Sequence, residues 1–580
     1  MLKRLLIANR GEIARRIIRA CRELGVETVA VYSEADAKAP YVGEADRAVR
    51  IGPAPARESY LNIDAIITAA RESGADSVHP GYGFLSERAP FARACEDAGL
   101  IFVGPPSSSL LKMGSKIGAR KLLTGAGVPV VPGETPSDQS DASLTAAAGR
   151  VGFPVLIKPS SGGGGIGMKV ARSAEQMAEA LAAARREAKA SFGDDTLFIE
   201  RLIEQPRHVE IQVFADNHGN VVHLFERECS AQRRHQKMLE ESPCQALSPS
   251  VRARMGEAAI ATAKAVDYRN AGTCEFLLEG SGDSARFYFL EMNTRLQVEH
   301  PVTECVTGVD LVHAQLRVAS GEPLPFTQEG LSQRGHAIEC RIYAEDPSQG
   351  FLPQAGTLER YSEPQGPGIR VDSGVRQGSE VSVFYDPMLA KLIVHAETRD
   401  AARRRALTAL DNYSIAGIRT NIELLKQILV HPQFVDAAID TGFLDREVQA
   451  LVANIPAIPD DEVRAVDAPP ASTVAPKDPF IGLSGWRIDG RTTWSGAATS
   501  SRTARRQTRN DSGVMSPMPA TVVAIKTAAG EKVAEGDTVI VLEAMKMELP
   551  IKAPRSGVVK AIHCAKGDLV QPNVTLLEIE

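Results

Sequence analysis

The C-terminal part of this 580-residue chain repeats one short pattern, and this repeat constrains the fold more than any other feature of the sequence. Ser516-Pro517 aligns with Ala553-Pro554, and the offset of 37 residues (516 to 553) then holds to the end of the chain. The matched pairs are Ala520/Gly557, Val522/Val559, Ile525/Ile562, Gly530/Gly567, Val533/Val570, Leu542/Ile579 and Glu543/Glu580. Because β-branched residues separated by glycine turns form short strands, this pattern predicts an all-β domain of two related halves.

Lys546 lies where the two halves meet, in the sequence Ala544-Met545-Lys546-Met547. A hairpin tip between two pseudo-symmetric halves presents a side chain rather than burying it. The alternative is an ordinary surface lysine, but two methionines flank this one on an otherwise polar tip. The stretch resembles the biotin attachment site of biotin carboxyl carrier domains, whereas lipoyl domains, which share the symmetric fold, usually have Asp before their lysine. We therefore predict that Lys546 is biotinylated.

The composition excludes several classes of protein. At 580 residues the chain is too long for one core, and its net charge of −6 gives no excess of basic residues for binding nucleic acid. The eight cysteines form no CxxC pair, which argues against a zinc site or a disulfide framework. No apolar run reaches the length of a membrane span, and Met1 leads almost directly into a strand-like segment. We therefore expect a cytoplasmic protein without a signal peptide.

The order of predicted elements divides the chain into segments. An α/β pattern begins with a strand at Leu5–Ala8; the first turn after it has one glycine and no GxGxxG, so NAD binding is disfavoured. A segment rich in Pro, Ala and polar residues, with a short island around Trp486 and Trp494, is typical of a linker. The expected segments are 1–112 (α/β), 113–203 (helices, then strands around a glycine run), 204–447 (mixed), 448–512 (linker) and 513–580 (all-β).

A run of glycines between two predicted strands indicates a phosphate-binding loop. The strands are Val155–Lys158 and Met168–Val170, and the glycines between them begin at Gly162. Glycine lets backbone N–H groups approach phosphate oxygens because no Cβ is in the way. A P-loop is excluded, since no Gly-Lys-Ser/Thr occurs and a strand rather than a helix follows. A flexible hairpin is the alternative, but a glycine loop that joins two strands, with Lys158 just before it, resembles the ATP-grasp fold.

Polar and apolar residues alternate through the segment 291–299. The polar members are Glu291, Asn293, Arg295, Gln297 and Glu299. If the whole segment is a strand, these five side chains share one face. Upstream, Cys274–Leu278 can pair with Phe287–Met292, which brings Glu275 close to Glu291. Two carboxylates and an amide at one place predict a site for Mg²⁺ that bridges ATP phosphates, with a solvated sheet face as the alternative.

Two further features are ambiguous by themselves. The run Glu226–Lys237 has the composition of a charged surface, and Arg341 would by default be a surface arginine. Beside an ATP site, both instead suit the binding of phosphate and a small anion.

Several longer motifs resemble biotin carboxylase over about residues 1–446. They are Asn9-Arg10-Gly11-Glu12-Ile13-Ala14, His79–Glu87, Arg207-His208-Val209-Glu210 and Glu291–Pro301. With the carrier domain, the chain resembles the α subunit of an acyl-CoA carboxylase of the acetyl-, propionyl-, methylcrotonyl- or geranyl-CoA type. The resemblance implies an ATP-grasp biotin carboxylase followed by a flattened β-barrel biotinyl domain. It also implies biotin, ATP and Mg²⁺ (or Mn²⁺) as cofactors, bicarbonate as substrate, and a carboxyltransferase β subunit and a biotin protein ligase as partners.

The same resemblance assigns functional residues by matching position. ATP binding falls to Lys116, Lys158, Gly163, Gly164, Gly165, Glu200, Ile203, His208, Gln232, His235 and Lys237. The metal ligands are Glu275, Glu291 and Asn293. Bicarbonate is held by Lys237, Arg295, Gln297, Val298 and Arg341. Glu299 is the general base that removes the proton of bicarbonate, and Arg295 stabilises the enolate-like oxygen of biotin.

The chain departs from the family pattern at three places. Ile166 stands where the glycine loop usually has Arg or Lys, and Ala520 stands where the carrier domain usually has Gly. The segment 448–512 is shorter than the domain with which many α subunits dock their β partner. Since no carboxyltransferase region follows the carrier domain, the acceptor is expected to be handled by another polypeptide. The alternatives are a subunit that serves pyruvate or urea, and a degenerate carrier scaffold, which only Ile166 supports.

Overall fold

The computed structural model describes residues 2–160, 167–234, 236–456, 513–545 and 547–580. They belong to two compact units, Met1–Ile458 and Pro459–Glu580. Several predicted features lie outside the described residues: Gly163, Gly164, Gly165, Ile166, His235, Trp486, Trp494 and Lys546. None of the described helices combines the length and the apolar character that crossing a membrane requires.

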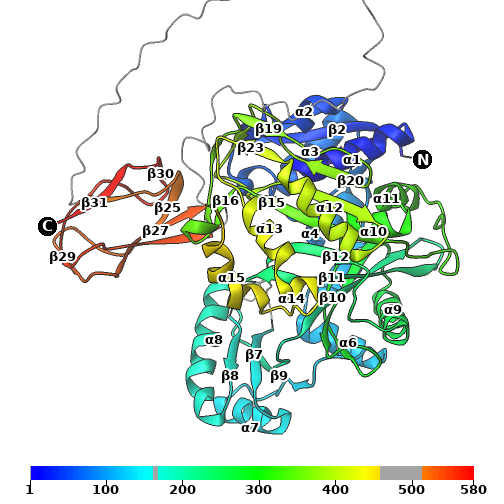
Figure 1. Ribbon diagram of the computed structural model, residues 1–580, viewed down its shortest axis with the longest axis horizontal. Coiled ribbons are helices and arrows are strands. Elements are labelled where there is room, and N and C mark those ends of the chain that lie inside the picture. Colours follow the sequence, from blue (N-terminus) through cyan, green and yellow to red (C-terminus); the bar gives the residue numbers. More distant parts are fainter. Residues whose placement is uncertain (1, 161–166, 235, 457–512, 546) are drawn as a thin grey trace, which may run out of the picture. The chain divides into compact units, whose positions relative to one another are not determined.

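The first unit begins with five parallel strands in the order β3-β2-β1-β4-β5 (Figure 1). The strands are β1 (Arg4–Ile7), β2 (Glu27–Ser33), β3 (Arg47–Gly52), β4 (Ser77–His79) and β5 (Ile101–Phe102). The helices are α1 (Gly11–Leu24), α2 (Pro40–Glu44), α3 (Ile63–Ser73), α4 (Ala89–Asp97) and α5 (Ser107–Met113). Leu5, Leu6 and Ile7 are all buried, as expected of a parallel strand that is covered on both faces. The predicted α/β pattern is confirmed.

A four-stranded sheet of order β6-β9-β7-β8 follows, with helices beside it (Figure 1). Its strands are β6 (Gly133–Glu134), β7 (Val155–Pro159), β8 (Lys169–Ala171) and β9 (Leu197–Arg201). The helices of this region are α6 (Lys116–Gly125), α7 (Asp141–Val151) and α8 (Met177–Phe192). Since β7 and β8 pair antiparallel, the strands predicted on either side of the glycine run are confirmed.

The largest sheet has eight strands in the order β14-β13-β10-β11-β12-β15-β22-β20, with every neighbouring pair antiparallel. The strands are β10 (Arg207–Ala215), β11 (Val221–Arg233), β12 (Gln236–Ser242), β13 (Asn270–Glu279), β14 (Arg286–Asn293), β15 (His336–Tyr343), β20 (Ile369–Ser373) and β22 (Met388–Ala396). The helices around it are α9 (Pro249–Ala265), α10 (His300–Thr307), α11 (Leu311–Ala319), α12 (Arg399–Asp411), α13 (Ile422–Val430), α14 (Pro432–Val435) and α15 (Phe443–Ala453). The predicted segment boundary at residue 447 therefore lies inside α15.

Short strands in pairs complete the first unit. They are β16 (Glu345–Asp346) with β17 (Leu352–Pro353), β18 (Gly356–Thr357) with β21 (Glu380–Val381), and β19 (Arg360–Ser362) with β23 (Ser414–Ala416).

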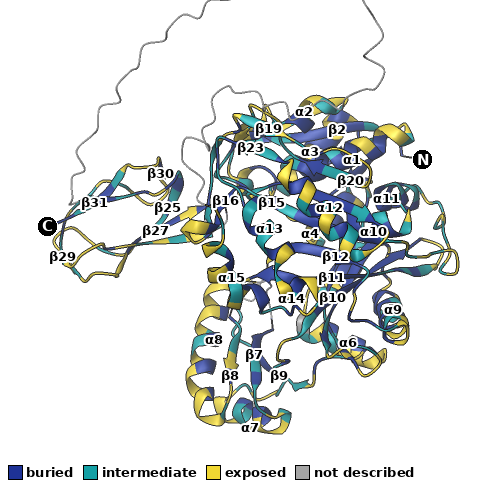
Figure 2. Ribbon diagram, viewed as in Figure 1, coloured by how far each residue is buried: buried dark blue, intermediate teal, exposed yellow. Residues whose placement is uncertain are grey.

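Strand β10 is buried along almost its whole length, although its residues alternate in character (Figure 2). The odd-numbered residues that pack in a hydrophobic core are Val209, Ile211 and Val213. The even-numbered residues, which face the other way, are His208, Glu210 and Gln212, and they are equally buried. Because burying a charge is costly unless it is paired, this second face must bring compensating charges together.

The second unit contains two four-stranded sheets, of order β24-β31-β29-β26 and β28-β27-β25-β30. The strands are β24 (Gly513–Met515), β25 (Ala520–Ile525), β26 (Lys532–Val533), β27 (Thr538–Ala544), β28 (Met547–Lys552), β29 (Gly557–Ile562), β30 (Leu569–Val570) and β31 (Thr575–Ile579). The offset of 37 residues converts the bounds of β25 and β26 into those of β29 and β30. The predicted repeat is confirmed. Strands β27 and β28 pair up to Ala544 and Met547, so only Met545 and Lys546 separate them in the sequence.

Candidate active site

A row of charged residues crosses four neighbouring strands of the large sheet. Arg227 on β11 lies opposite Glu210 on β10. Glu210 in turn lies opposite Glu275 on β13, and Glu275 lies opposite Glu291 on β14. The predicted hairpin that brings Glu275 to Glu291 is therefore confirmed. Three glutamates in a row would repel one another, so this face of the sheet requires cations.

Lys237, on the next strand β12, supplies one of these cations. Its Nζ lies 2.6 Å from Glu210, 2.9 Å from Glu275 and 2.6 Å from Glu299. Burial opposes the charge on Lys237, but the three carboxylates outweigh it and raise the pKa of this lysine well above its ordinary value. Lys237 is therefore a fixed positive charge at the centre of the site.

Glu299 lies just before α10 and is almost completely buried. One oxygen accepts a hydrogen bond from Lys237, and the other accepts one from Arg341 at 3.1 Å. Burial raises the pKa of such a carboxyl, but the charges of Lys237, Arg341 and Arg227 overcome this and lower the pKa of Glu299 well below its ordinary value. Glu299 is thus ionised at neutral pH, in the form that can accept a proton.

The predicted strand over 291–299 is only partly correct. Strand β14 ends at Asn293, and residues 294–299 form a turn that leads into α10. Pro301 at the start of α10 fixes where that helix begins, so the extended alternation cannot continue. The five polar side chains therefore do not share one strand face. Gln297 still reaches the site through the turn, donating to Glu275 at 3.0 Å.

Arg295 and Val298 occupy the edges of this turn. The guanidinium of Arg295 donates to Glu87 at 2.9 Å and to the side-chain oxygen of Asn293 at 3.0 Å. The carbonyl of Val298 accepts a hydrogen bond from Lys391 at 2.8 Å. Glu87 belongs to the motif His79–Glu87, so the N-terminal α/β part contributes directly to the position of Arg295.

The predicted metal ligands lie together where the C-terminal end of β14 pairs with the middle of β13. Asn293 donates its amide to Glu275 at 2.7 Å, and Glu291 lies opposite Glu275. His208 Nε2 lies 3.1 Å from Glu275. The carboxylate and amide oxygens form the donor set that a hard divalent cation such as Mg²⁺ prefers. Glu275, Glu291 and Asn293 therefore suit the metal that the sequence predicts.

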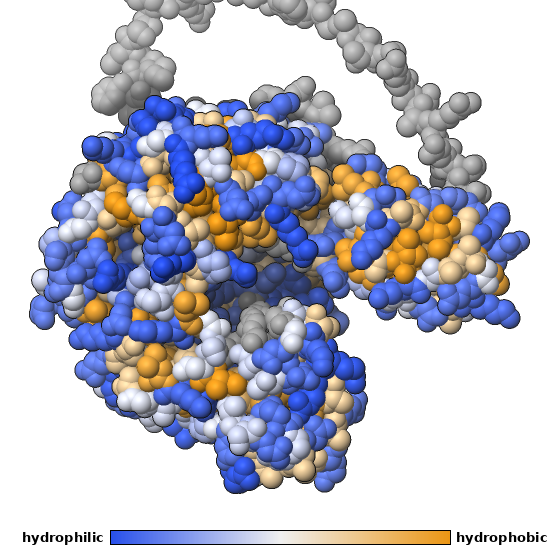
Figure 3. Space-filling view, turned by 180° about the vertical axis from the view of Figure 1, so that it is seen from behind, coloured by the Kyte–Doolittle hydropathy of each residue, from blue (hydrophilic) through white to orange (hydrophobic). Residues whose placement is uncertain are grey.

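A cavity lies beside this group and has both apolar and charged walls. It is lined by Met113, Gly114, Ala119, Arg120, Val130, Lys158, Phe198, Glu200, Phe289, Leu290, Glu291 and Met292. Glu200 pairs with Lys158 at 3.0 Å and with Arg120 at 2.5 Å. A flat apolar ring fits between the apolar walls, while Lys158 and Glu291 place a cation and a possible metal ligand in the same cavity. In Figure 3 the first unit is hollowed, and hydrophilic residues gather in the hollow.

The remaining predicted residues that the structure describes are Gln232, Ile203 and Lys116, and of these Gln232 and Ile203 are buried. Gln232 lies on β11, with its side-chain oxygen 3.5 Å from the ring of His208. Ile203 is buried just beyond the end of β9, and Lys116 begins α6. Strand β11 is buried from Glu226 to Arg233, so the charged-surface interpretation is wrong for that part of the run, while Arg234 and Gln236 are exposed.

Sequence reasoning missed several residues that hold the site together. Arg227, Glu210, Glu240 and Lys391 are buried and bond directly to predicted site residues or to one another. Glu210 stands inside a recognised motif but received no role. The signal that could have found Arg227 is a charged residue in the middle of a long predicted strand, since such a residue must meet a partner when buried.

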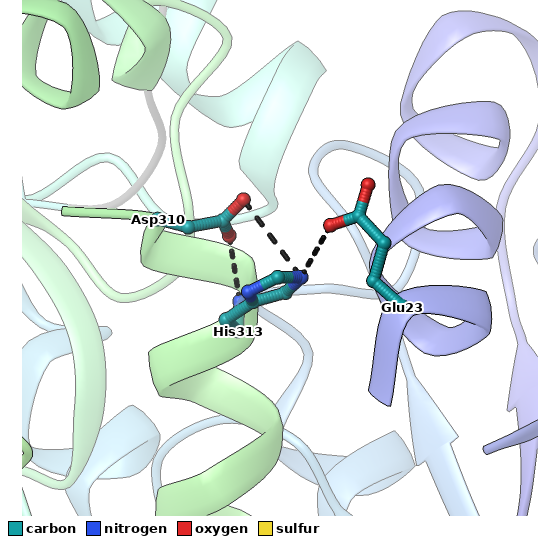
Figure 4. Close-up of side chains that lie close together, drawn as sticks. All are labelled: Glu23, Asp310 and His313. Carbon is teal, nitrogen blue, oxygen red and sulfur yellow. Dashed lines mark hydrogen bonds and ion pairs between the residues drawn. The ribbon is translucent and has the colours of Figure 1, made fainter. Parts of the chain in front are cut away.

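A separate group of possible metal ligands lies between α1 and α11 (Figure 4). His313 Nε2 lies 2.9 Å from Glu23 and 4.0 Å from Asp310. Asp310 also caps α11 and pairs with Arg16 at 2.6 Å. Because the arginine already compensates Asp310, we interpret this group as ion pairs that join the two helices.

Family models match this chain along most of its length. They are described as "Biotin carboxylase, N-terminal domain" (residues 1–110), "Carbamoyl-phosphate synthase L chain, ATP binding domain" (115–327), "Biotin carboxylase C-terminal domain" (339–446) and "Biotin-requiring enzyme" (512–579). The mitochondrial methylcrotonoyl-CoA carboxylase subunit alpha of Mus musculus is 41% identical over 670 aligned residues, which cover 100% of this chain and 93% of the relative. The chain belongs to the α subunits of biotin-dependent acyl-CoA carboxylases.

Other relatives and solved structures agree with this assignment. The mitochondrial propionyl-CoA carboxylase alpha chain of Sus scrofa is 40% identical to this α subunit. The alignment covers 100% of this α subunit and 91% of the relative. The biotin carboxylase domain of Hydrogenobacter thermophilus 2-oxoglutarate carboxylase, solved with MgADP and bicarbonate, is 44% identical with a TM-score of 0.74. That comparison covers 78% of this α subunit and 99% of the solved chain. The ATP-grasp fold predicted from the glycine loop is therefore confirmed.

Proposed function

We propose that this α subunit uses ATP and bicarbonate to carboxylate biotin attached to its own Lys546. The observation that carries the proposal is the state of Glu299. This buried carboxylate is held ionised by Lys237 and Arg341, and the row of Glu210, Glu275 and Glu291 connects it to the nucleotide cavity. A base of this kind beside a phosphate site suits the activation of a weak nucleophile by proton removal.

We assign the binding of bicarbonate to the cations around Glu299. Lys237, Arg341 and Arg295 offer positive charge, and the amide of Gln297 offers a donor. The carboxylate of Glu299 takes the proton from the hydroxyl group of bicarbonate. The oxygen so freed attacks the γ-phosphorus of ATP, the bond to the β-phosphate oxygen breaks, and ADP leaves with that electron pair. Lys158 offsets phosphate charge during this transfer.

The two non-protein groups fit residues of this chain. Glu275, Glu291 and Asn293 would hold Mg²⁺, or Mn²⁺, which when bound neutralises phosphate charge. Biotin on Lys546 would supply a ureido nitrogen that exchanges its proton for the carboxyl group, and phosphate would leave the carboxyl carbon and take up that proton. In this scheme Arg295 faces the developing negative charge on biotin, and Glu87 fixes the orientation of its guanidinium.

The final acceptor is proposed to be an acyl-CoA that a separate carboxyltransferase β subunit binds. The named relatives, which are carboxylase α subunits for methylcrotonoyl-CoA and propionyl-CoA, support this class. The alignment with the mouse subunit has 670 positions, 90 more than the 580 residues here, so the mouse subunit has residues that this chain lacks. We propose that a reduced docking segment within 448–512 accounts for part of this difference. A pyruvate or urea partner stays the alternative. The cytoplasmic location stays a prediction, because these relatives are mitochondrial.

Bicarbonate-dependent release of ADP with free biotin tests the proposed reaction. We expect activity in the wild-type chain, and its loss in Glu299→Gln and Arg295→Ala, with biotinylation of Lys546 intact in both. Near-normal turnover in either variant would contradict the assigned roles. A wild-type chain that is fully biotinylated but releases no ADP would instead favour the carrier scaffold, which Ile166 suggests.

Co-purification tests the acceptor. The α subunit should bring down a carboxyltransferase polypeptide, and the complex should be assayed with acetyl-, propionyl- and methylcrotonyl-CoA, and with pyruvate and urea. Carboxylation of only the last two substrates would overturn the acyl-CoA proposal and leave the biotin carboxylase activity in place.

A further inference from the structure

Arg227 is a fully buried side chain near the middle of β11, and it uses all five of its N–H groups. Nε donates to Glu210 at 2.6 Å. The other acceptors are Gln212 at 2.8 Å, Thr303 at 3.0 Å, Thr273 at 3.1 Å and Gln297 at 2.7 Å. A single guanidinium thus joins strands β10, β11 and β13, the turn after β14, and helix α10.

Two of these contacts set the orientation of groups assigned to bicarbonate. Arg227 donates to the side-chain oxygen of Gln297, so the amide nitrogen of Gln297 must point the other way, toward Glu275. Arg227 also binds one oxygen of Glu210, while the other oxygen holds Lys237 at 2.6 Å. Removal of Arg227 would free the amide to rotate and would leave Glu210 with a single cation.

The other three contacts hold Arg227 itself in place. Gln212 donates its own amide to the backbone carbonyl of Gly272 at 2.9 Å, which fixes its oxygen toward the guanidinium. Thr273 and Thr303 approach from β13 and from α10, and both are fully buried. Lysine could replace the charge at this position but not five donors in one plane.

We propose that Arg227 is a positioning residue for bicarbonate, acting through Gln297 and through Glu210 on Lys237. This inference rests on the proposed function. The hydrogen bonds of Arg227 reach the bicarbonate site through these two neighbours. Its charge also helps to lower the pKa of Glu299, and a lysine at this position would keep that charge. Neither Gln297 nor Glu210 lines the nucleotide cavity, and Lys237 is the one neighbour also assigned to ATP, so Arg227 governs the affinity for bicarbonate more than that for ATP.

Arg227→Lys tests the proposal in the full-length, biotinylated chain. We expect the KM for bicarbonate to rise about tenfold or more, because the amide of Gln297 loses its anchor. The KM for ATP should stay within about twofold. A purely structural role would instead lower the fraction of active protein and leave both KM values unchanged. Arg399→Lys is the matched control, since Arg399 is also heavily hydrogen-bonded, to Glu241 and to the carbonyl groups of Phe434 and Val435, away from the site.

A second pair of variants keeps the test valid if Arg227→Lys does not fold. Thr303→Val removes one anchor of Arg227 at nearly constant volume, whereas Thr303→Ser keeps the hydroxyl group. We expect Thr303→Val to raise the KM for bicarbonate a few-fold and Thr303→Ser to restore it. Unchanged bicarbonate KM in both Thr303→Val and any folded Arg227→Lys would overturn the positioning role. A wild-type chain without bicarbonate-dependent ADP release would overturn the proposed function itself, and this inference with it.

Discussion

Arg341 is shared between two carboxylates, and this sharing affects the proton balance of the site. Its guanidinium binds Glu299 at 3.1 Å and Glu240 at 2.6 Å. Burial raises the pKa of Glu240 to about 7, since Arg341 only partly offsets burial and Glu299 adds to it. Glu240 therefore changes charge near neutral pH, while Glu299 stays ionised. Below pH 7, Glu240 is protonated and neutral, so Glu299 is the one charged carboxylate of this pair that Arg341 binds.

Glu240→Gln should remove this response from the pH profile. In the wild type we expect bicarbonate-dependent kcat/KM to change with an apparent pKa near 7. The variant should be flat in that range, because its amide does not titrate. Initial rates of ADP release between pH 6 and 8.5 measure this, and an identical inflection in both proteins would show that another group is responsible.

The same substitution gives a prediction for stability. The folded-state pKa of Glu240 is raised above its ordinary 4.5, so protonation favours the folded state. This stabilisation is fully present below pH 4.5 and is lost as the pH rises through about 7. The melting temperature of Glu240→Gln minus that of the wild type should therefore be more positive at pH 8 than at pH 5. Thermal unfolding at the two pH values checks the sign, and the opposite order would contradict it.

At the scale of the element, β13 holds much of the site together through one residue, Glu275. Glu275 bonds to Lys237, His208, Asn293 and Gln297. Although Glu275 and Glu291 are both predicted metal ligands, the loss of Glu275 also releases these four side chains.

Glu275→Gln and Glu291→Gln should both raise the Mg²⁺ concentration needed for half-maximal turnover, and Glu275→Gln should lower kcat further. A Mg²⁺ titration of ADP release, together with Mg²⁺-dependent binding of a fluorescent nucleotide, separates the two effects. Glu279→Gln is the control on the same strand, since Glu279 pairs with Arg201 and Arg286 instead. Equal effects of Glu275→Gln and Glu279→Gln would refute a specific metal role.

The elements also show what local sequence can and cannot predict. The strands at the glycine run and the Glu275–Glu291 pair could be predicted, because alternation and turn residues are local signals. The end of β14 at Asn293 was not predicted, because polar and apolar residues go on alternating through the turn that follows. That alternation ends only where α10 begins. Its place in the middle of a long strand marks Arg227 as a residue that needs buried partners, but local sequence does not identify them, because they come from four other segments.

At the scale of the whole molecule, the chain divides into two units whose cores are separate. The residues of the candidate site all belong to the first unit, apart from Lys546. The second unit has its own two sheets and its own internal repeat.

Lys546→Arg should therefore remove the attachment of biotin while leaving the biotin carboxylase reaction intact. We expect the variant to release ADP with free biotin at the wild-type rate, because no residue of the nucleotide cavity changes. Streptavidin blotting should detect no biotin on it, and the complex with its carboxyltransferase should not carboxylate any acyl-CoA. Labelling of the variant at another lysine would contradict the prediction for Lys546.

The row of Arg227, Glu210, Glu275 and Glu291 depends on the register of four strands. Successive side chains of a strand point to opposite faces, so a slip of one residue in any of the four would exchange core and site. Val209 or Ile211 would then face Lys237, and a glutamate would enter the hydrophobic core. A misregistered sheet would lose its stability and its ligands together. Nucleotide binding can thus serve as an assay of the correct strand register.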